Sequence, residues 1–254
     1  MIHSFLLIGQ SNMSGRGIAS EVEPILDARL KMLRNGRWLP MRTPVATDRI
    51  FAGVSLAESF ALAYANDHPG VEVGLIPCSD GGTTLDQWQV HGLLFDHAIY
   101  QSRLAARTSH IVGILWHQGE SDSREGLYQH YTEKFLPIMQ AFREELNLPD
   151  VPWIIGELGD YLANITLEQY EWLRKNYLKI NEQLMQIAQN DPLVGFASAK
   201  GLEPNPDNLH INSKSLREFG LRYYEEFRKL ENKNKVYEEK PKESAAIRSQ
   251  LELL

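Results

Sequence analysis

Cysteine is almost absent from this chain, which has 254 residues and a single cysteine, Cys78. A lone cysteine excludes an intramolecular disulfide and any zinc site that is built on cysteine ligands. Basic residues are also few, since 26 Lys and Arg face 33 Asp and Glu and the net charge is −7. Because an acidic surface is not typical of proteins that bind nucleic acid or anionic membranes, we expect neither as a partner.

Long apolar runs are missing as well. No run reaches the roughly 20 residues that a transmembrane helix needs. The opening stretch, MIHSFLLIGQ, has too short an apolar region for a signal peptide and no small-residue cleavage site. We therefore expect a cytoplasmic protein. Hydrophobic residues make up 43% of the chain, which is enough for one large core and one main domain.

Short apolar runs alternate with amphipathic segments along most of the chain. Each apolar run is followed by Gly, Pro, Ser, Asn or Asp, which is typical of a strand that ends in a turn. Continuous apolar strands separated by helices indicate a parallel sheet covered on both faces. The sequence therefore predicts a three-layer α/β/α fold with a central five-stranded parallel sheet. Its strands are expected at 4–8, 71–76, 111–116, 153–158 and 193–198.

Four helical patterns lie between or after these runs. Ser55 with Glu58, and Thr166 with Gln169, have the spacing of a capping box and predict the starts of two helices. The other two patterns of apolar residues at helical spacing cover 127–146 and 216–230.

The character of the chain changes after the last helical pattern. A mixed-charge run with a proline follows, which is typical of a solvated linker, and the final residues could form one short helix. We therefore expect a folded domain over 1–230 and a charged linker with a short helix or tail over 231–254. The tail could be frayed, or it could dock on this or a neighbouring subunit and so support a homo-oligomer.

Ligands of open parallel sheets bind beyond the carboxyl ends of the strands, so the loops after each strand are the candidate site. Ser11 follows the first strand directly, and Asp207 and His210 follow the last one. An aspartate three residues before a histidine can accept from one ring nitrogen and leave the other to face a nucleophile. The sequence therefore places a serine and an Asp-His pair at one edge of the sheet.

Hydrogen-bond donors are expected at the same edge. Gln118 ends the third strand, and Gly82 in the loop after the second allows a backbone amide to approach a ligand closely. Two donors beside a serine and an Asp-His pair are what acyl transfer requires. The histidines and carboxylates show no metal-site spacing, so no metal is expected.

Four further residues are candidate substrate contacts, although each has a structural alternative. Gln10 and Asn12 flank the serine, and Trp88 is the tryptophan in a site loop that could stack on a sugar. Glu120 could act as a second acid, or it could be a carboxylate that buttresses its loop.

Four stretches at these positions resemble the SGNH (GDSL-like) hydrolase superfamily, and within it the sialate O-acetylesterase and acetylxylan esterase-like carbohydrate esterases. They occur in the family's order between residue 5 and about 224, and Asn208 stands where a glycine is frequent in the closing block. The four stretches are GQSNM, GGTTLDQW, HQGESD and DNLHINSKSLREFG.

The resemblance implies a serine esterase without a cofactor, whose catalytic domain is 1–230. Ser11 would be the nucleophile, His210 the general base and Asp207 the residue that orients it. The amides of Ser11 and of Gly82 or Gly81 would form the oxyanion hole together with Gln118. The expected substrate is an acetylated carbohydrate, such as a xylo-oligosaccharide or sialate. A short-chain esterase or lipase on the same scaffold and a non-catalytic sugar-binding protein are the alternatives.

Overall fold

The computed structural model of the protein describes residues 1–242 and has a central seven-stranded sheet in the order β3-β2-β4-β1-β5-β6-β7. Five neighbouring strands are parallel and correspond to the five predicted apolar runs, so the α/β class and the central parallel sheet are confirmed. These five are β1 (Ile2–Gly9), β4 (Glu72–Pro77), β5 (His110–His117), β6 (Trp153–Gly156) and β7 (Val194–Ala197).

The predicted number of five strands is wrong, because two more strands extend one edge of the sheet. β2 (Leu30–Arg34) pairs in parallel with β4, and β3 (Arg37–Pro40) pairs antiparallel with β2. The turn between them is Asn35-Gly36, and both residues have positive φ. An Asn-Gly pair between two short runs is a strong hairpin signal, so this sequence feature could have revealed the missing strands.

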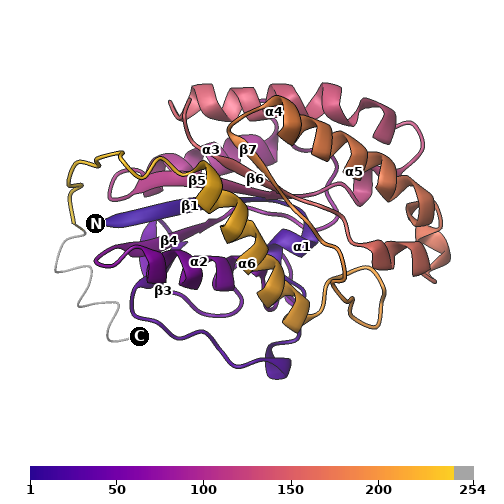
Figure 1. Ribbon diagram of the computed structural model, residues 1–254, viewed down its shortest axis with the longest axis horizontal. Coiled ribbons are helices and arrows are strands. Elements are labelled where there is room, and N and C mark those ends of the chain that lie inside the picture. The colour runs from indigo at the N-terminus through magenta and orange to yellow at the C-terminus, as the bar shows by residue number, and fades with distance from the viewer. Residues whose placement is uncertain (243–254) are drawn as a thin grey trace.

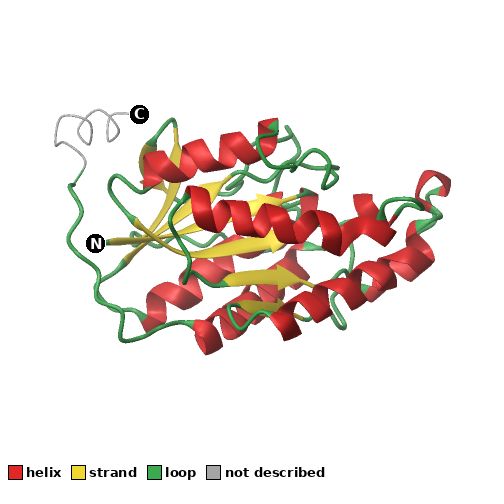
Figure 2. Cartoon of the chain, turned by 90° about the horizontal axis from the view of Figure 1, so that it is seen from above, coloured by secondary structure: helices red, strands yellow, loops and turns green. Residues whose placement is uncertain are grey.

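Helices cover both faces of the sheet (Figures 1 and 2). On one face α2 (Leu56–Asp67) and α6 (Ser213–Leu230) lie side by side, as Figure 1 shows. The other face is covered by α3 (Leu93–Ala105), α4 (Tyr131–Glu145) and α5 (Leu173–Asn190). The layer order is therefore α/β/α, as the sequence predicts.

The helix starts agree with the sequence in one case and differ in another. The capping box at Ser55 and Glu58 is formed, which confirms the predicted start of α2. The box predicted at Thr166 is wrong, because α5 begins only at Leu173 and has no side-chain cap. A 3₁₀ turn, Glu168–Tyr170, precedes it. None of the four helical patterns in the sequence predicts helix α3.

Aromatic side chains fill the core on each side of the sheet. Phe5 of β1 makes edge-on contacts with Phe60 of α2 and Phe227 of α6, at centroid distances of 4.8 and 5.3 Å. On the opposite face Trp116 of β5 stacks on Phe135 of α4 at 4.7 Å. Burial of such large apolar surfaces anchors both helical layers to the strands whose ends carry the site.

The segment after α6 returns to the edge of the molecule where the strands begin. Tyr237 packs against the rings of His3 and His110, at centroid distances of 4.7 and 4.9 Å. The short helix predicted near the end of the chain, and its suggested role in a homo-oligomer, lie outside the described residues. Among residues 1–242, none of the helices has the length and apolar character needed to span a bilayer.

Candidate active site

The first part of the site is the turn that carries Ser11. β1 ends at Gly9, and α1 (Ser11–Ser14) is a single helical turn that starts two residues later. Gly9 has φ of +124°, and a Cβ at this position would lie 2.2 Å from the carbonyl oxygen of His117. Only glycine can combine this conformation with so close an approach between β1 and β5. The chain therefore turns sharply at the carboxyl end of β1 and presents Ser11 there.

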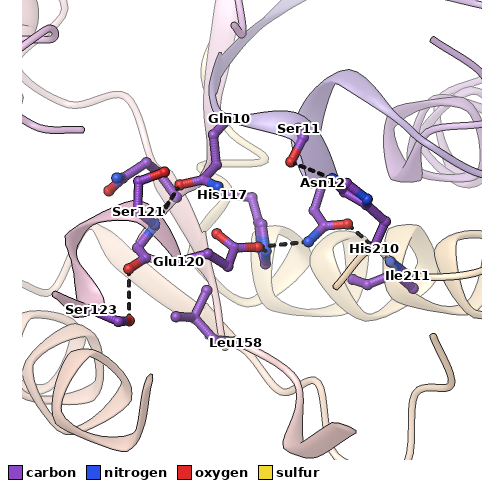
Figure 3. Close-up of polar contacts among 12 residues, drawn as sticks. Gln10, Ser11, Asn12, His117, Glu120, Ser121, Ser123, Leu158, His210 and Ile211 are labelled. Atoms are coloured by element: carbon purple, nitrogen blue, oxygen red, sulfur yellow. Dashed lines mark hydrogen bonds and ion pairs between the residues drawn. The ribbon is translucent and has the colours of Figure 1, made fainter. Parts of the chain in front are cut away.

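Ser11, His210 and Asp207 form one chain of hydrogen bonds, although Ser11 and His210 are 199 positions apart in sequence. The hydroxyl of Ser11 lies 3.0 Å from Nε2 of His210 (Figure 3). Nδ1 of His210 lies 2.6 Å from Oδ2 of Asp207. The structure thus brings together the three residues that the sequence singles out, with the imidazole between the hydroxyl and the carboxylate.

The electrostatics of Asp207 fix which ring nitrogen carries the proton. Partial burial alone would raise the pKa of Asp207, but hydrogen bonds from the imidazole of His210 and from the amides of His210 and Leu209 lower it to about 2. The carboxylate is therefore ionised at neutral pH and can only accept hydrogen bonds. Nδ1 of His210 must donate to it, which leaves Nε2 free to accept the proton of Ser11.

The loop that carries His210 is held in place at several points. Asn208 has φ of +52°, a left-handed conformation that asparagine tolerates better than most residues. The carbonyl of His210 accepts from the amide of Asn205 at 2.6 Å. Asn212 then caps α6 by accepting from the amide of Ser215 at 2.8 Å. The imidazole therefore projects from a fixed turn at the start of a long helix.

Asn12 connects this loop to the end of β5. Its side-chain oxygen accepts from the amide of Ile211 at 3.0 Å, and its nitrogen donates to Glu120 at 2.6 Å (Figure 3). Asn12 is 1% exposed, so both ends of its amide are used inside the protein. This corrects the expectation that Asn12 contacts substrate, because its side chain instead joins the loops around Ser11.

Glu120 lies at the edge of the cavity with its carboxylate turned inward. Burial alone would raise the pKa of Glu120, but the interaction with His117 and the hydrogen bond from Asn12 lower it. Nε2 of His117 lies 3.5 Å from Oε1 of Glu120. The side chain therefore braces the loop, which is the alternative that the sequence left open. Gln10 lines the cavity, and its Oε1 accepts weakly from the amides of Gly119 and Ser121 at 3.4 and 3.3 Å.

The two glycines after β4 have different amide environments. The amide of Gly81 donates to Oδ2 of Asp48 at 2.9 Å, so it is already occupied. Within residues 1–242 the amide of Gly82 has no hydrogen-bond acceptor, and Gly82 lines the same cavity as Ser11 and His210. Of the two amides that the sequence could not distinguish, that of Gly82 is the one available to a ligand.

Gln118 differs from expectation. Its side-chain nitrogen donates to the carbonyl of Thr83 at 3.0 Å and to the carboxylate of Asp122 at 2.5 Å. The side chain is fully buried and does not line the cavity. This corrects the expectation that Gln118 is an oxyanion donor, because both of its N–H groups are engaged with internal acceptors.

Trp88 is also placed differently from the prediction. It is fully buried, its indole nitrogen donates to Thr83 at 3.0 Å, and its ring meets Trp116 edge-on at 5.5 Å. The expectation that Trp88 stacks on a sugar is therefore wrong. The loop after β4 folds back over the sheet and packs this large ring into the core.

The triad opens into a cavity of about 230 Å³. Sequence reasoning missed nine of the side chains that line it. The missed residues are Arg16, Arg49, Phe51, Ser121, Arg124, Tyr170, Trp172, Leu173 and Leu209. Tyr170 ends the 3₁₀ turn Glu168–Tyr170 before α5, and this turn puts it on the cavity wall. For Phe51, exposure of 65% in a loop is the feature that marks it, and sequence does not show exposure.

Two features give the cavity wall its chemistry. Aromatic rings of Phe51, Tyr170 and Trp172 offer flat apolar surface of the kind that packs on sugar rings. The guanidinium of Arg124 lies 5.1 Å from the centre of the Trp172 ring. Among the described residues, Arg124 has no carboxylate partner, whereas Arg16 is paired with Asp48. A positive charge therefore remains available beside an aromatic surface.

Comparison with known proteins gives consistent results. The family described as carbohydrate esterase, sialic acid-specific acetylesterase matches residues 1–229. A probable carbohydrate esterase of Arabidopsis thaliana is 26% identical over 244 residues, which cover 85% of this chain and 86% of the relative.

Solved structures show the same fold. The X-ray structure of an Arabidopsis thaliana protein superposes with a TM-score of 0.77 at 24% identity, covering 89% of this chain and 98% of that one. A carbohydrate acetylesterase from Xanthomonas citri has a TM-score of 0.65 at 19% identity, covering 92% of this chain and 57% of that one.

A serine, an aspartate and a histidine therefore lie at the edge of an α/β/α sheet, and this chain shares its fold with these solved structures. The chain belongs to the sialic acid-specific acetylesterase family of carbohydrate esterases. It is therefore a carboxylic ester hydrolase.

Proposed function

We propose that the protein removes O-acetyl groups from a carbohydrate by a serine mechanism, and that the sugar carries a carboxylate. The observation that carries the proposal is the Ser11–His210–Asp207 chain of hydrogen bonds at the mouth of a cavity with a free arginine. Family membership supports the reaction class, and the wall of the cavity supports the acidic sugar.

In the first step the hydroxyl of Ser11 attacks the acetyl carbonyl while Nε2 of His210 takes the hydroxyl proton. The new C–O bond gives a tetrahedral intermediate, whose negative oxygen is stabilised by the amides of Ser11 and Gly82. The intermediate collapses as the bond to the sugar oxygen breaks, and His210 returns its proton to that oxygen. Ionised Asp207 stabilises the imidazolium throughout.

The second step releases acetate. Water enters the cavity and gives a proton to His210, and its oxygen attacks the acetyl-serine carbonyl. The second tetrahedral intermediate breaks its bond to Oγ of Ser11, which is reprotonated by His210. The enzyme thus returns to its starting state, with the hydroxyl of Ser11 protonated and Nε2 of His210 free to accept again.

Arg124 is the group that we assign to the sugar carboxylate. It lines the cavity beside Trp172 and lacks an acidic partner within the described residues, so it can pair with an anion at little electrostatic cost. Arginine is suited to this role because its planar guanidinium can bind both carboxylate oxygens.

The test compares an O-acetylated sialic acid with its methyl ester, which has the same acetyl group and a masked carboxylate. We expect the parent to have a kcat/KM about 10-fold higher for the acid, and Arg124→Gln to lose most of this ratio, because a charge-assisted hydrogen bond contributes about 1.5 kcal/mol or more. Equal kcat/KM values of the parent for the acid and the ester would contradict the proposal that the sugar substrate carries a carboxylate.

A second variant tests the serine mechanism independently. Ser11→Ala should lower kcat by about 10³-fold or more while the protein remains folded, since a catalytic serine acts as a unit with its histidine. A folded Ser11→Ala protein that releases acetate at the parental rate would exclude the mechanism.

A further inference from the structure

The peptide unit that joins Gly81 to Gly82 is hydrogen-bonded to Arg49, which is 32 positions earlier in the chain. The carbonyl of Gly81 accepts a hydrogen bond from Nη2 of Arg49 at 2.9 Å. In a trans peptide the carbonyl and the following N–H lie in one plane and point in opposite directions. The bond from Arg49 therefore also sets the direction of the Gly82 N–H.

The neighbouring peptide is fixed by the residue before Arg49. The amide of Gly81 donates to Oδ2 of Asp48, and Asp48 is held by both terminal nitrogens of Arg16 at 2.6 and 3.3 Å. A Cβ at Gly81 would lie 2.5 Å from Nη2 of Arg16 and 3.0 Å from Asp48. Glycine at 81 therefore lets this buried ion pair approach the backbone closely.

Arg49 is itself anchored by two more contacts. Its Nη1 donates to the carbonyl of Asp48 at 2.8 Å and pairs with Oδ1 of Asp80 at 2.9 Å. The guanidinium thus bridges the loop that carries it and the loop after β4. Since the guanidinium is held by hydrogen bonds to the carbonyls of Asp48 and Gly81 and by the ion pair with Asp80, rotation of the Gly81–Gly82 peptide would break the hydrogen bond to Gly81.

We propose that Arg49 is a positioning residue that orients and polarises the Gly82 N–H toward the reacting carbonyl. The inference rests on the proposed function, because it concerns the donor assigned to the oxyanion. A cation that donates to the Gly81 carbonyl draws electron density through the peptide and makes the Gly82 N–H a stronger donor. Both effects matter most in the tetrahedral intermediate, where the charge develops.

Arg49 is exposed enough to have a simpler role, since 42% of its side chain is accessible and it lines the cavity. It could bind a substrate carboxylate directly. The two roles differ on a neutral substrate, because an ester without a carboxylate needs the oxyanion donor but gives a carboxylate-binding arginine nothing to hold.

The experiment uses p-nitrophenyl acetate with parent, Arg49→Ala and Arg103→Ala proteins. Arg103 is a matched control, since it also pairs with a carboxylate, Glu145, but lies away from the cavity. For Arg49→Ala we expect kcat to fall about 10- to 100-fold with KM within about 2-fold, as loss of an oxyanion donor costs up to about 10³-fold. The melting temperature should stay close to that of Arg103→Ala.

Chemical rescue separates positioning from a general structural effect. Guanidinium chloride at about 10 mM is too dilute to unfold a protein, but it can occupy the space left by the side chain. We expect it to raise kcat of Arg49→Ala several-fold, with no effect on the parent or Arg103→Ala and with sodium chloride as the ionic-strength control.

Three results would overturn the inference: an unchanged kcat, a loss confined to KM, or a loss that follows the melting temperature and is not rescued. These differ from failure of the proposed function itself. In that case the parent would not hydrolyse the ester, or Ser11→Ala would be as active as the parent.

Discussion

Replacement of Gln118 by alanine should destabilise the protein far more than it slows the chemistry. Its side-chain amide donates to two acceptors, the carbonyl of Thr83 and the carboxylate of Asp122, and all three groups are buried or nearly so. Removal of the donor leaves both acceptors without this partner. A buried acceptor that loses its donor costs about 1–3 kcal/mol, so we expect a loss of about 4 kcal/mol in the free energy of unfolding.

For a protein of this size, 1 kcal/mol corresponds to about 2–4 °C in melting temperature. Gln118→Ala should therefore melt about 8–16 °C below the parent. Gln140→Ala is the matched control, since Gln140 is an exposed glutamine that donates to Glu144 on the surface of α4. Its melting temperature should change by no more than about 2 °C, as expected of a surface site.

Gln118→Glu adds a second, pH-dependent test. It would place a carboxylate next to that of Asp122, whose pKa burial already raises to about 6 despite hydrogen bonds from Gln118 and Leu85. Two buried carboxylates in contact cannot both ionise without a large cost. The variant should therefore be less stable at pH 8 than at pH 5, relative to the parent at each pH.

The assay measures kcat at a temperature where every variant is folded, together with thermal melting. As a brace, Gln118 should affect kcat per folded molecule by less than about 10-fold in the alanine variant. An oxyanion donor would give the reverse pattern, a loss of about 10²- to 10³-fold in kcat with an unchanged melting temperature. That pattern would refute the bracing role and restore the role expected from sequence.

Three other substitutions test the burial and charge of the site. Trp88→Ala should lower the free energy of unfolding by about 3–5 kcal/mol and leave KM unchanged, because the ring is a core side chain; a raised KM at parental stability would contradict this. Asp207 has a folded pKa of about 2, below its unfolded value of 3.8, so its stabilising contribution is present above pH 4 and is lost as the pH falls toward 2. Urea unfolding from pH 5 to 2 should show that Asp207→Asn loses less stability than the parent. Asp122 has the opposite shift, so the folded state takes up a proton between about pH 6 and 4 and gains stability as the pH falls through that range. Asp122→Asn should remove that gain in stability. If the free energy of unfolding of parent and variant had the same pH dependence, the raised pKa of Asp122 would be excluded.

Features that depend on local sequence could be predicted. Five strands are marked by continuous apolar runs, and the start of α2 is marked by a capping box that needs only Ser55 and Glu58. The Asp207–His210 pair is likewise local, since the two residues are three positions apart in the chain. Its meeting with Ser11 follows from a general rule, that the carboxyl ends of parallel strands share one edge of the sheet.

Features that depend on how loops fold back could not be predicted. Trp88 lies in a loop after a strand, where exposure and burial are equally compatible with the sequence, and only its packing on Trp116 decides between them. The segment with Asp48 and Arg49 belongs to no helix or strand, yet it reaches the loop after β4 more than 30 residues later in the chain. No periodicity or spacing marks such a contact.

The residues at the carboxyl ends of the strands form two layers, one that faces the cavity and one that is buried beneath it. Sequence alone cannot assign a residue to one of these two layers. Ser11, His210 and Gly82 face the cavity, whereas Asn12 and Gln118 lie just beneath with their polar groups engaged inside the protein. The lower layer has to be polar, because the loops at the strand ends carry buried backbone groups and carboxylates that need partners. Residues of the two layers are adjacent in sequence and similar in type, but their substitution should have different consequences. If the proposed mechanism holds, we expect a change in the cavity-facing layer to remove a group that acts on the transition state and to lower kcat. A change in the buried layer should leave an unpaired polar atom and lower stability.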